Sequence, residues 1–315
     1  MDEITAAIDV LRRGGLVGFP TETVYGLGAD ASNDAAVARL FEVKRRPPDH
    51  PVIVHIDSEQ RLDGVAVGVT STATRLAAAF WPGPLTLVLR RRPGAVSDRV
   101  TGGRDTVAVR VPDHPLALDL LARFGGGIAA PSANRFGRVS PTTAAHVRAD
   151  LDRDVDLVLD GGPSAVGLES TIVDCSVGPP RILRIGAITT AQVESTIGET
   201  PQLANRGEAA APGTLRSHYA PRAEIEIVHA SDIASRVAAN SARRVGVLAL
   251  AGVASDVTGV TVLDPPRDVD EYAHVLYQRL RDADRAQLDL VLVVPPPADD
   301  IGAAVVDRLE RAAAR

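Results

Sequence analysis

The segment from residue 201 to residue 221 interrupts the regular spacing of hydrophobic residues and divides the chain into two parts. It contains Pro201, the alanines 209–211, Pro212-Gly213 and Pro221, a composition typical of a linker. The 315 residues suffice for two domains, each with its own hydrophobic core. We therefore predict a first domain over residues 1–203, a linker over 204–221 and a second domain over 222–315.

In the first part, hydrophobic runs and helical patterns alternate without a regular βαβ period. This pattern predicts an α/β domain with a mixed, twisted sheet rather than a Rossmann fold. Strands are expected at 16–19, 52–56, 85–89, 106–111, 127–130, 157–159, 170–174 and 181–185, and helices at 3–13, 34–44, 71–80, 115–124, 142–150 and 189–197.

In the second part, strands and helices alternate as in a small Rossmann-like domain with a parallel sheet. This part has no glycine fingerprint for a nucleotide, so we expect it to support the linker. Strands are expected at 224–228, 244–250, 260–264 and 288–294, and helices at 231–241, 269–285 and 301–313.

Composition excludes several classes of protein. No stretch approaches the ~18 apolar residues of a membrane span, and the N-terminus is acidic where a secretory signal would be basic. The single cysteine, Cys175, can form neither an internal disulfide nor a zinc site, so we expect no metal held by the protein. These features predict a cytoplasmic protein with no membrane partner. Residues before and after position 205 each carry a net charge of −3, unlike a nucleic-acid-binding module.

Lys44 is the only lysine in the chain, against 33 arginines. Because arginine is used wherever either cation would serve, the exception should lie where a compact ammonium does what a planar guanidinium cannot. The alternative is that one lysine remains by chance. Arg45-Arg46-Pro47 follow it directly.

Short polar clusters follow most of the predicted strands. Each has an ordinary explanation, since Ser and Asn close turns, buried Thr satisfies the backbone and Arg is usually a solvated charge. Together they supply cations, hydroxyls and an amide, which suits a polyanion with a polar organic partner. The clusters are residues 20–28, 44–47 with His50 and His55, Thr106 with Arg110, 131–134, 140–142, 169–171 and 184–186.

These clusters closely resemble motifs of the YrdC-like family of L-threonylcarbamoyladenylate synthases. The resemblance covers residues 4 to about 200, and Ser217-His218-Tyr219-Ala220-Pro221 resembles the segment that joins the two domains in the longer form of the enzyme. The matching motifs are Pro20-Thr21-Glu22-Thr23-Val24-Tyr25-Gly26-Leu27-Gly28, Lys44-x-Arg46-Pro47 with His55, Trp81-Pro82-Gly83-Pro84-Leu85-Thr86, Arg110-Val111-Pro112, Pro131-Ser132-Ala133-Asn134, Ser140-Pro141-Thr142 and Gly167-Leu168-Glu169-Ser170-Thr171.

The resemblance implies a nucleotidyltransferase that converts L-threonine, bicarbonate and ATP into threonylcarbamoyl-AMP and pyrophosphate. Partner proteins would then pass the threonylcarbamoyl group to an adenosine of certain tRNAs, and direct tRNA binding stays open. The implied threonine-binding residues are Thr23, His55, Arg110, Ser132 and Ser170. The implied ATP-binding residues are Lys44, Arg46, His50, Thr106, Asn134, Thr142, Arg184 and Tyr219, of which Lys44 and Arg46 would be catalytic.

Those roles agree with the chemistry of the residues. Attack on the α-phosphorus of ATP builds negative charge that Lys44, Arg46, Arg184 and a magnesium ion could stabilise. Arg110 could hold the threonine carboxylate, and His55 could orient the threonine hydroxyl, although a structural strand histidine is the alternative.

Three departures from the family pattern stand out. His50 replaces a usual asparagine, Arg135-Phe136 replace a Leu-Ser pair, and Thr214-Leu215-Arg216-Ser217 replace a Met-Lys-Tyr-Lys type run. We further predict that residues 206–221 form a lid over the nucleotide. In the alternative, His218 and Tyr219 only dock the second domain.

Two other functions compete with the synthase. The same fold could be an RNA-binding module without synthase activity, but the charge and the few aromatic residues are unfavourable for it. A carbamoyltransferase of hydrogenase maturation would need zinc-binding cysteine clusters, which this chain lacks.

Overall fold

The computed structural model describes residues 2–204, 218–254 and 257–314. The chain divides into two compact units. The first comprises residues 1–136, 140–165 and 169–214, and the second comprises residues 137–139, 166–168 and 215–315. The lid predicted over 206–221 lies mostly outside the described residues and stays a prediction.

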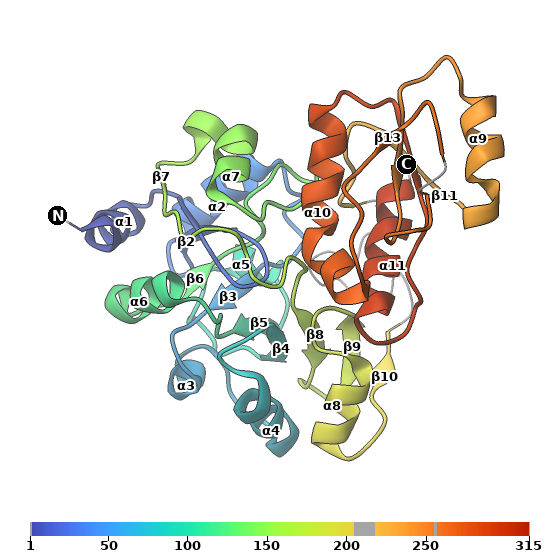
Figure 1. The fold of residues 1–315 in the computed structure, drawn as a ribbon. Coiled ribbons are helices and arrows are strands. Elements are labelled where there is room, and N and C mark those ends of the chain that lie inside the picture. Colours follow the sequence, from blue (N-terminus) through green and yellow to red (C-terminus); the bar gives the residue numbers. More distant parts are fainter. Residues whose placement is uncertain (1, 205–217, 255–256, 315) are drawn as a thin grey trace. The chain divides into compact units, whose positions relative to one another are not determined.

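In the described residues, the first unit contains a mixed sheet, as the sequence predicts (Figure 1). The sheet has ten strands, two more than the eight that the sequence predicts. Its strand order is β10-β9-β8-β4-β5-β3-β6-β2-β1-β7. The strands are β1 (Val17–Phe19), β2 (Gly26–Asp30), β3 (Ile53–His55), β4 (Leu85–Arg90), β5 (Thr106–Arg110), β6 (Ile128–Ala129), β7 (Leu157–Val158), β8 (Thr171–Asp174), β9 (Arg181–Arg184) and β10 (Gln202–Leu203).

The helices of this unit also follow the predicted pattern, with two short additions, α3 and α5. They are α1 (Glu3–Arg12), α2 (Asp34–Lys44), α3 (Leu62–Val65), α4 (Ser71–Phe80), α5 (Asp98–Thr101), α6 (Pro115–Phe124), α7 (Ala144–Leu151) and α8 (Thr190–Ile197). The helix expected at 142–150 starts two residues later, because the Thr143 side chain caps its N-terminus.

The two faces of the ten-stranded sheet differ in character. On one face, Leu27, Val54, Leu87 and Val109 share one large core with α2, α4 and α8. On the other face, α1 and α6 lie side by side and pack with β1 and β6 (Figure 1). Because side chains alternate along a strand, β3, β4 and β5 direct polar residues to this second face.

The strand β2 is absent from the sequence prediction, which treats residues 20–28 as a polar, glycine-punctuated segment. In the structure, β2 pairs with β1 and β6. A Cβ on Gly28 would lie 2.8 Å from a methyl group of Ile128, so glycine permits this packing. The strand β10 is also absent from the sequence prediction. It lies near the start of the segment 201–221, which interrupts the spacing of hydrophobic residues, and it pairs with β9.

The second unit contains a four-stranded parallel sheet of order β11-β14-β12-β13, as predicted. Helix α9 contributes Ile233 to the core of this sheet, while α10 and α11 pack against each other. Its elements are β11 (Glu224–Ile227), α9 (Ile233–Ala239), β12 (Val245–Leu248), β13 (Thr261–Val262), α10 (Val269–Arg285), β14 (Leu290–Val293) and α11 (Asp300–Ala313).

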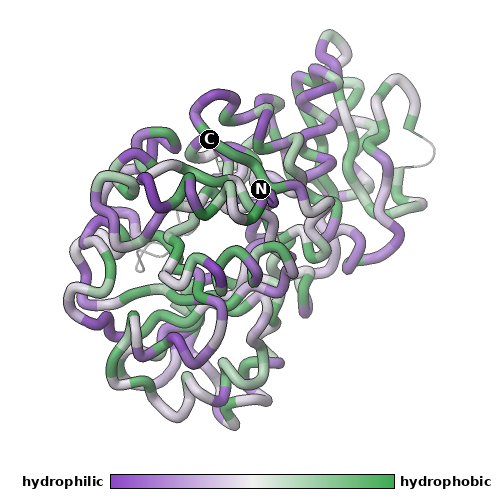
Figure 2. The backbone as a smooth tube through the Cα atoms, turned by 90° about the vertical axis from the view of Figure 1, so that its left-hand side faces the viewer, coloured by the Kyte–Doolittle hydropathy of each residue, from purple (hydrophilic) through white to green (hydrophobic). Residues whose placement is uncertain are grey.

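Hydrophobic and hydrophilic stretches alternate along the backbone in both units (Figure 2). Among the described residues, no helix combines the length and the apolar character needed to cross a membrane.

Candidate active site

Two of the predicted threonine-binding residues end neighbouring strands. His55 is the last residue of β3 and Arg110 the last residue of β5, and they are register partners in a parallel pair. Their side chains therefore point to the same face of the sheet. Both side chains are buried. The structure thus brings these two residues together, as the polar clusters at the strand ends predict.

Arg110 is held by three acceptors. Its Nη2 donates to Glu22 Oε1 at 2.6 Å, its Nη1 donates to Thr23 Oγ1 at 2.8 Å, and its Nε donates to the Gly83 carbonyl at 3.1 Å. The second Glu22 oxygen accepts the N–H of Asp113 at 3.0 Å. A buried guanidinium needs such a paired carboxylate, because an unpaired buried charge is costly.

Glu22 is absent from the predicted site, although it stands between two threonines of the matched motif. Its signal in the sequence is a charged residue inside a segment that is otherwise neutral and rich in glycine. The predicted site also omits Thr86 and Glu169, whose side chains are buried. Thr86 Oγ1 lies against Ser170 Oγ, and Glu169, which directly precedes Ser170, accepts a hydrogen bond from Ser140.

His55 is a neutral imidazole in this environment. Burial, reinforced by the Arg110 cation, lowers the pKa of His55 to about 3. Its ring meets Phe19 edge-on, with 5.8 Å between ring centroids. Among the described residues its Nδ1 has no hydrogen-bond partner, so this buried atom can serve a polar ligand group.

Ser170 and Arg184 form a second polar cluster. The Arg184 guanidinium donates to the Ser170 carbonyl through Nε at 3.0 Å and Nη2 at 2.9 Å, and to Ser170 Oγ at 3.1 Å. Ser170 Oγ also lies 2.8 Å from Thr86 Oγ1. A predicted threonine-site hydroxyl and a predicted nucleotide-site cation therefore touch.

Lys44 lies at the end of α2 and is 1% exposed. Its Nζ donates to the carbonyl oxygens of Ser132 at 2.5 Å and Asn134 at 2.6 Å. Burial, together with the nearby Arg46 cation, lowers the pKa of Lys44 well below its usual value, whereas the two carbonyls favour the protonated form. The lysine thus joins the loop 132–134, which contains two predicted ligand residues, to α2.

Arg46 and His50 lie next to each other beyond α2. Arg46 Nε donates to the His50 carbonyl at 3.1 Å, and Nη2 donates to the Pro51 carbonyl at 2.8 Å. The Phe136 ring packs near both, 5.7 Å from the Arg46 guanidinium carbon and 5.8 Å from the His50 ring. Burial and then the Arg46 cation lower the pKa of His50.

Thr142 is connected to the loop that carries Thr23. Its backbone N–H and hydroxyl lie near His146 Nδ1, at 3.3 and 3.4 Å. The preceding residue, Pro141, accepts the N–H of Tyr25 at 2.8 Å, and Ser140 donates to Glu169 at 2.7 Å. The segments 21–25, 140–142 and 169–170 therefore form one connected polar region.

Thr106, a predicted nucleotide contact, lies apart from Arg110, although both residues belong to β5. It begins β5, whereas Arg110 ends the same strand. Four residues of extended chain separate the two α-carbons by roughly 13 Å.

Tyr219 belongs to the second unit and is 1% exposed there. Its ring stacks on Tyr277 of α10 with 5.5 Å between centroids, and the guanidinium of Arg308 lies 5.3 Å from its centre. His218 packs edge-on against it at 4.2 Å. These contacts fit the alternative to the lid, in which His218 and Tyr219 only dock the second domain.

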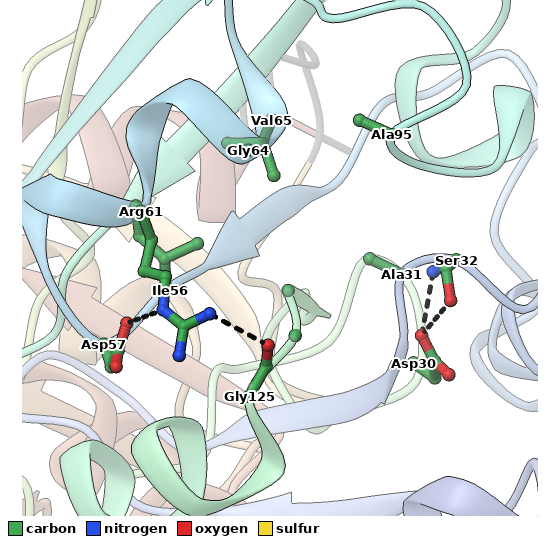
Figure 3. A pocket seen from close by; sticks show the side chains of 12 residues that line it. Asp30, Ala31, Ser32, Ile56, Asp57, Arg61, Gly64, Val65, Ala95 and Gly125 are labelled. Atoms are coloured by element: carbon green, nitrogen blue, oxygen red, sulfur yellow. Dashed lines mark hydrogen bonds and ion pairs between the residues drawn. The ribbon is translucent and has the colours of Figure 1, made fainter.

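A separate cavity of about 220 Å³ lies in the first unit (Figure 3). Arg61 spans it, with its guanidinium 3.5 Å from Asp57 and 3.3 Å from the Gly125 carbonyl. None of the predicted ligand residues lines this cavity. The lining residues are Asp30, Ala31, Ser32, Ile56, Asp57, Arg61, Gly64, Val65, Ala95, Gly125, Gly126 and Gly127.

In the described part of the chain, no group of three or more His, Cys, Asp or Glu side chains is arranged to hold a metal ion. The candidate site instead consists of three buried guanidiniums, one lysine and several hydroxyls. Such a set suits anionic ligands such as carboxylate and phosphate.

Comparison with known proteins connects this chain to one family. Residues 9–186 match the family model Sua5_yciO_yrdC, described as telomere recombination, and residues 188–314 match Sua5_C, described as the C-terminal domain of threonylcarbamoyl-AMP synthase. The threonylcarbamoyl-AMP synthase of Bacillus subtilis is 41% identical, covering 99% of this chain and 93% of the relative. That of Schizosaccharomyces pombe is 34% identical, covering 94% and 84%.

Solved structures give the same result. The crystal structure of Pyrococcus abyssi Sua5 complexed with L-threonine matches with a TM-score of 0.91 and 40% identity, covering 99% of this chain and 95% of that one. Full-length HypF, at 20% identity and a TM-score of 0.52 over 59% of this chain and 29% of that one, shows only a shared fold. The chain therefore belongs to the Sua5 family of threonylcarbamoyl-AMP synthases, whose two-domain form it shares from end to end.

Proposed function

We propose that this enzyme makes L-threonylcarbamoyl-AMP from L-threonine, bicarbonate and ATP and releases pyrophosphate. The observation that carries this proposal is the buried pair of Arg110 and His55 beside Thr23 on one sheet face. Support also comes from the P. abyssi relative, whose structure was solved with L-threonine.

The threonine end of the reaction needs an anchored carboxylate and a neutral amine. In this proposal, Arg110 binds the carboxylate with the N–H groups that its three protein acceptors leave free. His55, neutral at physiological pH, orients the threonine hydroxyl through a ring nitrogen. The amine then attacks carbon dioxide supplied by bicarbonate, forms an N–C bond and loses one proton.

At the nucleotide end, a carboxylate oxygen of the resulting carbamate attacks the α-phosphorus of ATP. The bond to pyrophosphate breaks, and the product is a mixed anhydride with AMP. Negative charge grows on the phosphate oxygens, so preorganised cations lower the barrier. We assign this role to Arg46 and Arg184, with Lys44 holding the loop that presents Ser132 and Asn134. The other nucleotide contacts that we propose are His50, Thr106 and Thr142, while the nucleotide role of Tyr219, which packs on Tyr277 in the second unit, stays a prediction.

A magnesium ion would enter with the nucleotide phosphates, because Mg²⁺ is usually held by substrate oxygens and few protein ligands. The described residues offer no ready ligand cluster, and no step here depends on the ion. We further propose that the product leaves for proteins that modify tRNA in the cytoplasm.

Pyrophosphate release from ATP tests the proposal. Release should require both L-threonine and bicarbonate, and the Arg110→Lys variant should lose ~100-fold in kcat/KM for threonine. A matched control is Arg75→Lys, since Arg75 also donates to a carbonyl but lies outside the site. Release of pyrophosphate without L-threonine would contradict the proposed reaction, and tRNA binding without any release would favour the RNA-binding alternative.

A further inference from the structure

Thr21, which the predicted site does not include, fixes the direction of a buried chain of hydrogen bonds. Its Oγ1 lies 2.6 Å from the Val24 carbonyl oxygen and 2.9 Å from Thr23 Oγ1. A carbonyl oxygen can only accept, so the single hydrogen of the Thr21 hydroxyl points to Val24. In the bond between the two threonines, Thr23 is therefore the donor, and Thr21 Oγ1 accepts its hydrogen beside the longer bonds from the N–H groups of Thr23 and Val24, both at 3.3 Å.

The number of hydrogens and lone pairs on Thr23 Oγ1 also limits the hydrogen bonds that Thr23 can form with a ligand. Its only hydroxyl hydrogen is used on Thr21, and one of its two lone pairs receives the Arg110 Nη1 hydrogen at 2.8 Å. One lone pair remains. Thr23 can thus accept a hydrogen bond from a ligand but cannot donate one.

Arg110, which lies next to Thr23, can donate hydrogen bonds to a ligand but cannot accept one. Three of its five N–H groups point to Glu22, Thr23 and Gly83, which leaves two donors. A donor pair and a lone acceptor next to it complement an α-amino acid, whose carboxylate and amine are attached to one carbon. With the carboxylate on Arg110, the amine is a donor that can reach the Thr23 oxygen, because Thr23 Oγ1 lies 2.8 Å from Arg110 Nη1.

We propose that Thr21 is a positioning residue that keeps the Thr23 hydroxyl an acceptor for the amine of the amino acid substrate. This inference rests on the proposed function. The direction matters chemically, because an acceptor binds an N–H of the amine and leaves the nitrogen lone pair free to attack carbon. A hydroxyl that donated to the nitrogen would occupy that lone pair.

The Thr21→Val variant removes the acceptor for the Thr23 hydrogen, which can then turn toward the amine nitrogen. L-Threonine affinity, measured by calorimetry, should fall about three- to tenfold, the scale of one hydrogen bond, and kcat should fall as well. Thr21→Ser should restore both quantities, while the KM for ATP stays unchanged. Thr101→Val is the matched control, since Thr101 is buried and donates to the Asp98 carbonyl at 3.2 Å, outside the site.

A double-mutant cycle separates positioning from general damage. If Thr21 acts through Thr23, then Thr21→Val should have no further effect in a Thr23→Val background. Additive losses would overturn the proposal, as would equal behaviour of Thr21→Val and Thr101→Val.

A second ligand tests which group Thr23 receives. L-2-Aminobutyrate keeps the amine and lacks the hydroxyl, so Thr21→Val should weaken its binding by the same factor as that of L-threonine. A loss confined to L-threonine would assign the hydroxyl to Thr23 and overturn the inference. If the wild-type enzyme binds L-threonine without releasing pyrophosphate, the proposed function fails, whereas these binding comparisons still decide the role of Thr21.

Discussion

At the scale of single residues, Lys44 shows why one lysine stands among 33 arginines. Its compact ammonium donates to two carbonyl oxygens of one tight loop, at Ser132 and Asn134. A planar guanidinium has its donors spread over a rigid fork, which fits two converging carbonyls poorly. This geometry is a structural reason for the single lysine, while a direct contact of Lys44 with phosphate stays a prediction.

Lys44→Ala should lower both stability and activity. Two buried carbonyls lose their donor, so the free energy of unfolding should fall by about 2 kcal/mol in a urea titration. Adenylate formation should drop ~100-fold, since Ser132 and Asn134 shift. Lys44→Arg should also lose activity, and Arg75→Lys serves as the control. Wild-type turnover of the arginine variant would refute the interpretation.

His55 makes stability depend on pH in a definite direction. Its folded pKa of about 3 lies below the unfolded value near 6.5, so as pH falls below about 6.5 the unfolded chain binds a proton that the folded protein does not. This residue should therefore cost about 1 kcal/mol of stability between pH 7.5 and pH 5.5. Urea midpoints of wild type and His55→Gln at both values measure it. An identical drop in the variant would contradict the assignment.

At the scale of elements, the backbone just after β9 packs closely against the backbone just before β8. A Cβ on Gly186 would meet the Glu169 carbonyl oxygen and lie 2.5 Å from the carbonyl carbon of Ser170. These neighbours are backbone atoms, which cannot turn away as a side chain can. Glycine at this position thus lets Arg184 and Ser170 approach each other.

Gly186→Ala should displace Ser170 and reduce both stability and threonine binding. We expect a loss of about 2 kcal/mol in the free energy of unfolding, typical of overpacking. Gly64→Ala is the control, because nothing lies within 4 Å of its added methyl group. Thermal unfolding and calorimetry with L-threonine measure the two effects. Equal behaviour of the two variants would show that the close approach is unimportant.

At the scale of the whole molecule, Tyr219 is part of the packing of the second unit. Arg308, fully buried on α11, bonds Asp307 at 2.6 Å and lies over the Tyr219 ring. The sequence analysis assigns this residue to a lid over the nucleotide, with docking of the second domain as the alternative. Its burial on Tyr277 instead predicts that truncation disturbs the second unit.

Tyr219→Ala should destabilise the second unit by about 3 kcal/mol, the cost of removing a buried aromatic ring, whereas Tyr219→Phe should have a small effect. Hydrogen exchange of α10 and α11 reports this change directly.

Limited proteolysis with and without ATP tests the lid predicted over residues 206–221. Protection by ATP in the Tyr219→Phe variant supports the lid, and equal cleavage in both conditions supports a tether.

Local residue patterns predict the types of most elements and the polar residues at their ends. Periodicity is a local property, so the helix over 34–44 and the strands that end at His55 and Arg110 could be predicted. Motif resemblance added the family and the candidate ligands. The glycine-rich strand β2 escaped prediction, because its glycines fit a tertiary contact with Phe19 and Ile128.

Which of those residues touch depends on how the whole chain folds. Glu22 and Arg110 are separated by 88 positions in the sequence, and their ion pair exists because β5 and the loop before β2 meet in the fold. The direction of the hydrogen-bond chain from Arg110 through Thr23 to Thr21 also depends on distances that no residue pattern encodes. Sequence patterns describe neighbours along the chain, whereas hydrogen bonds and ion pairs depend on neighbours in space.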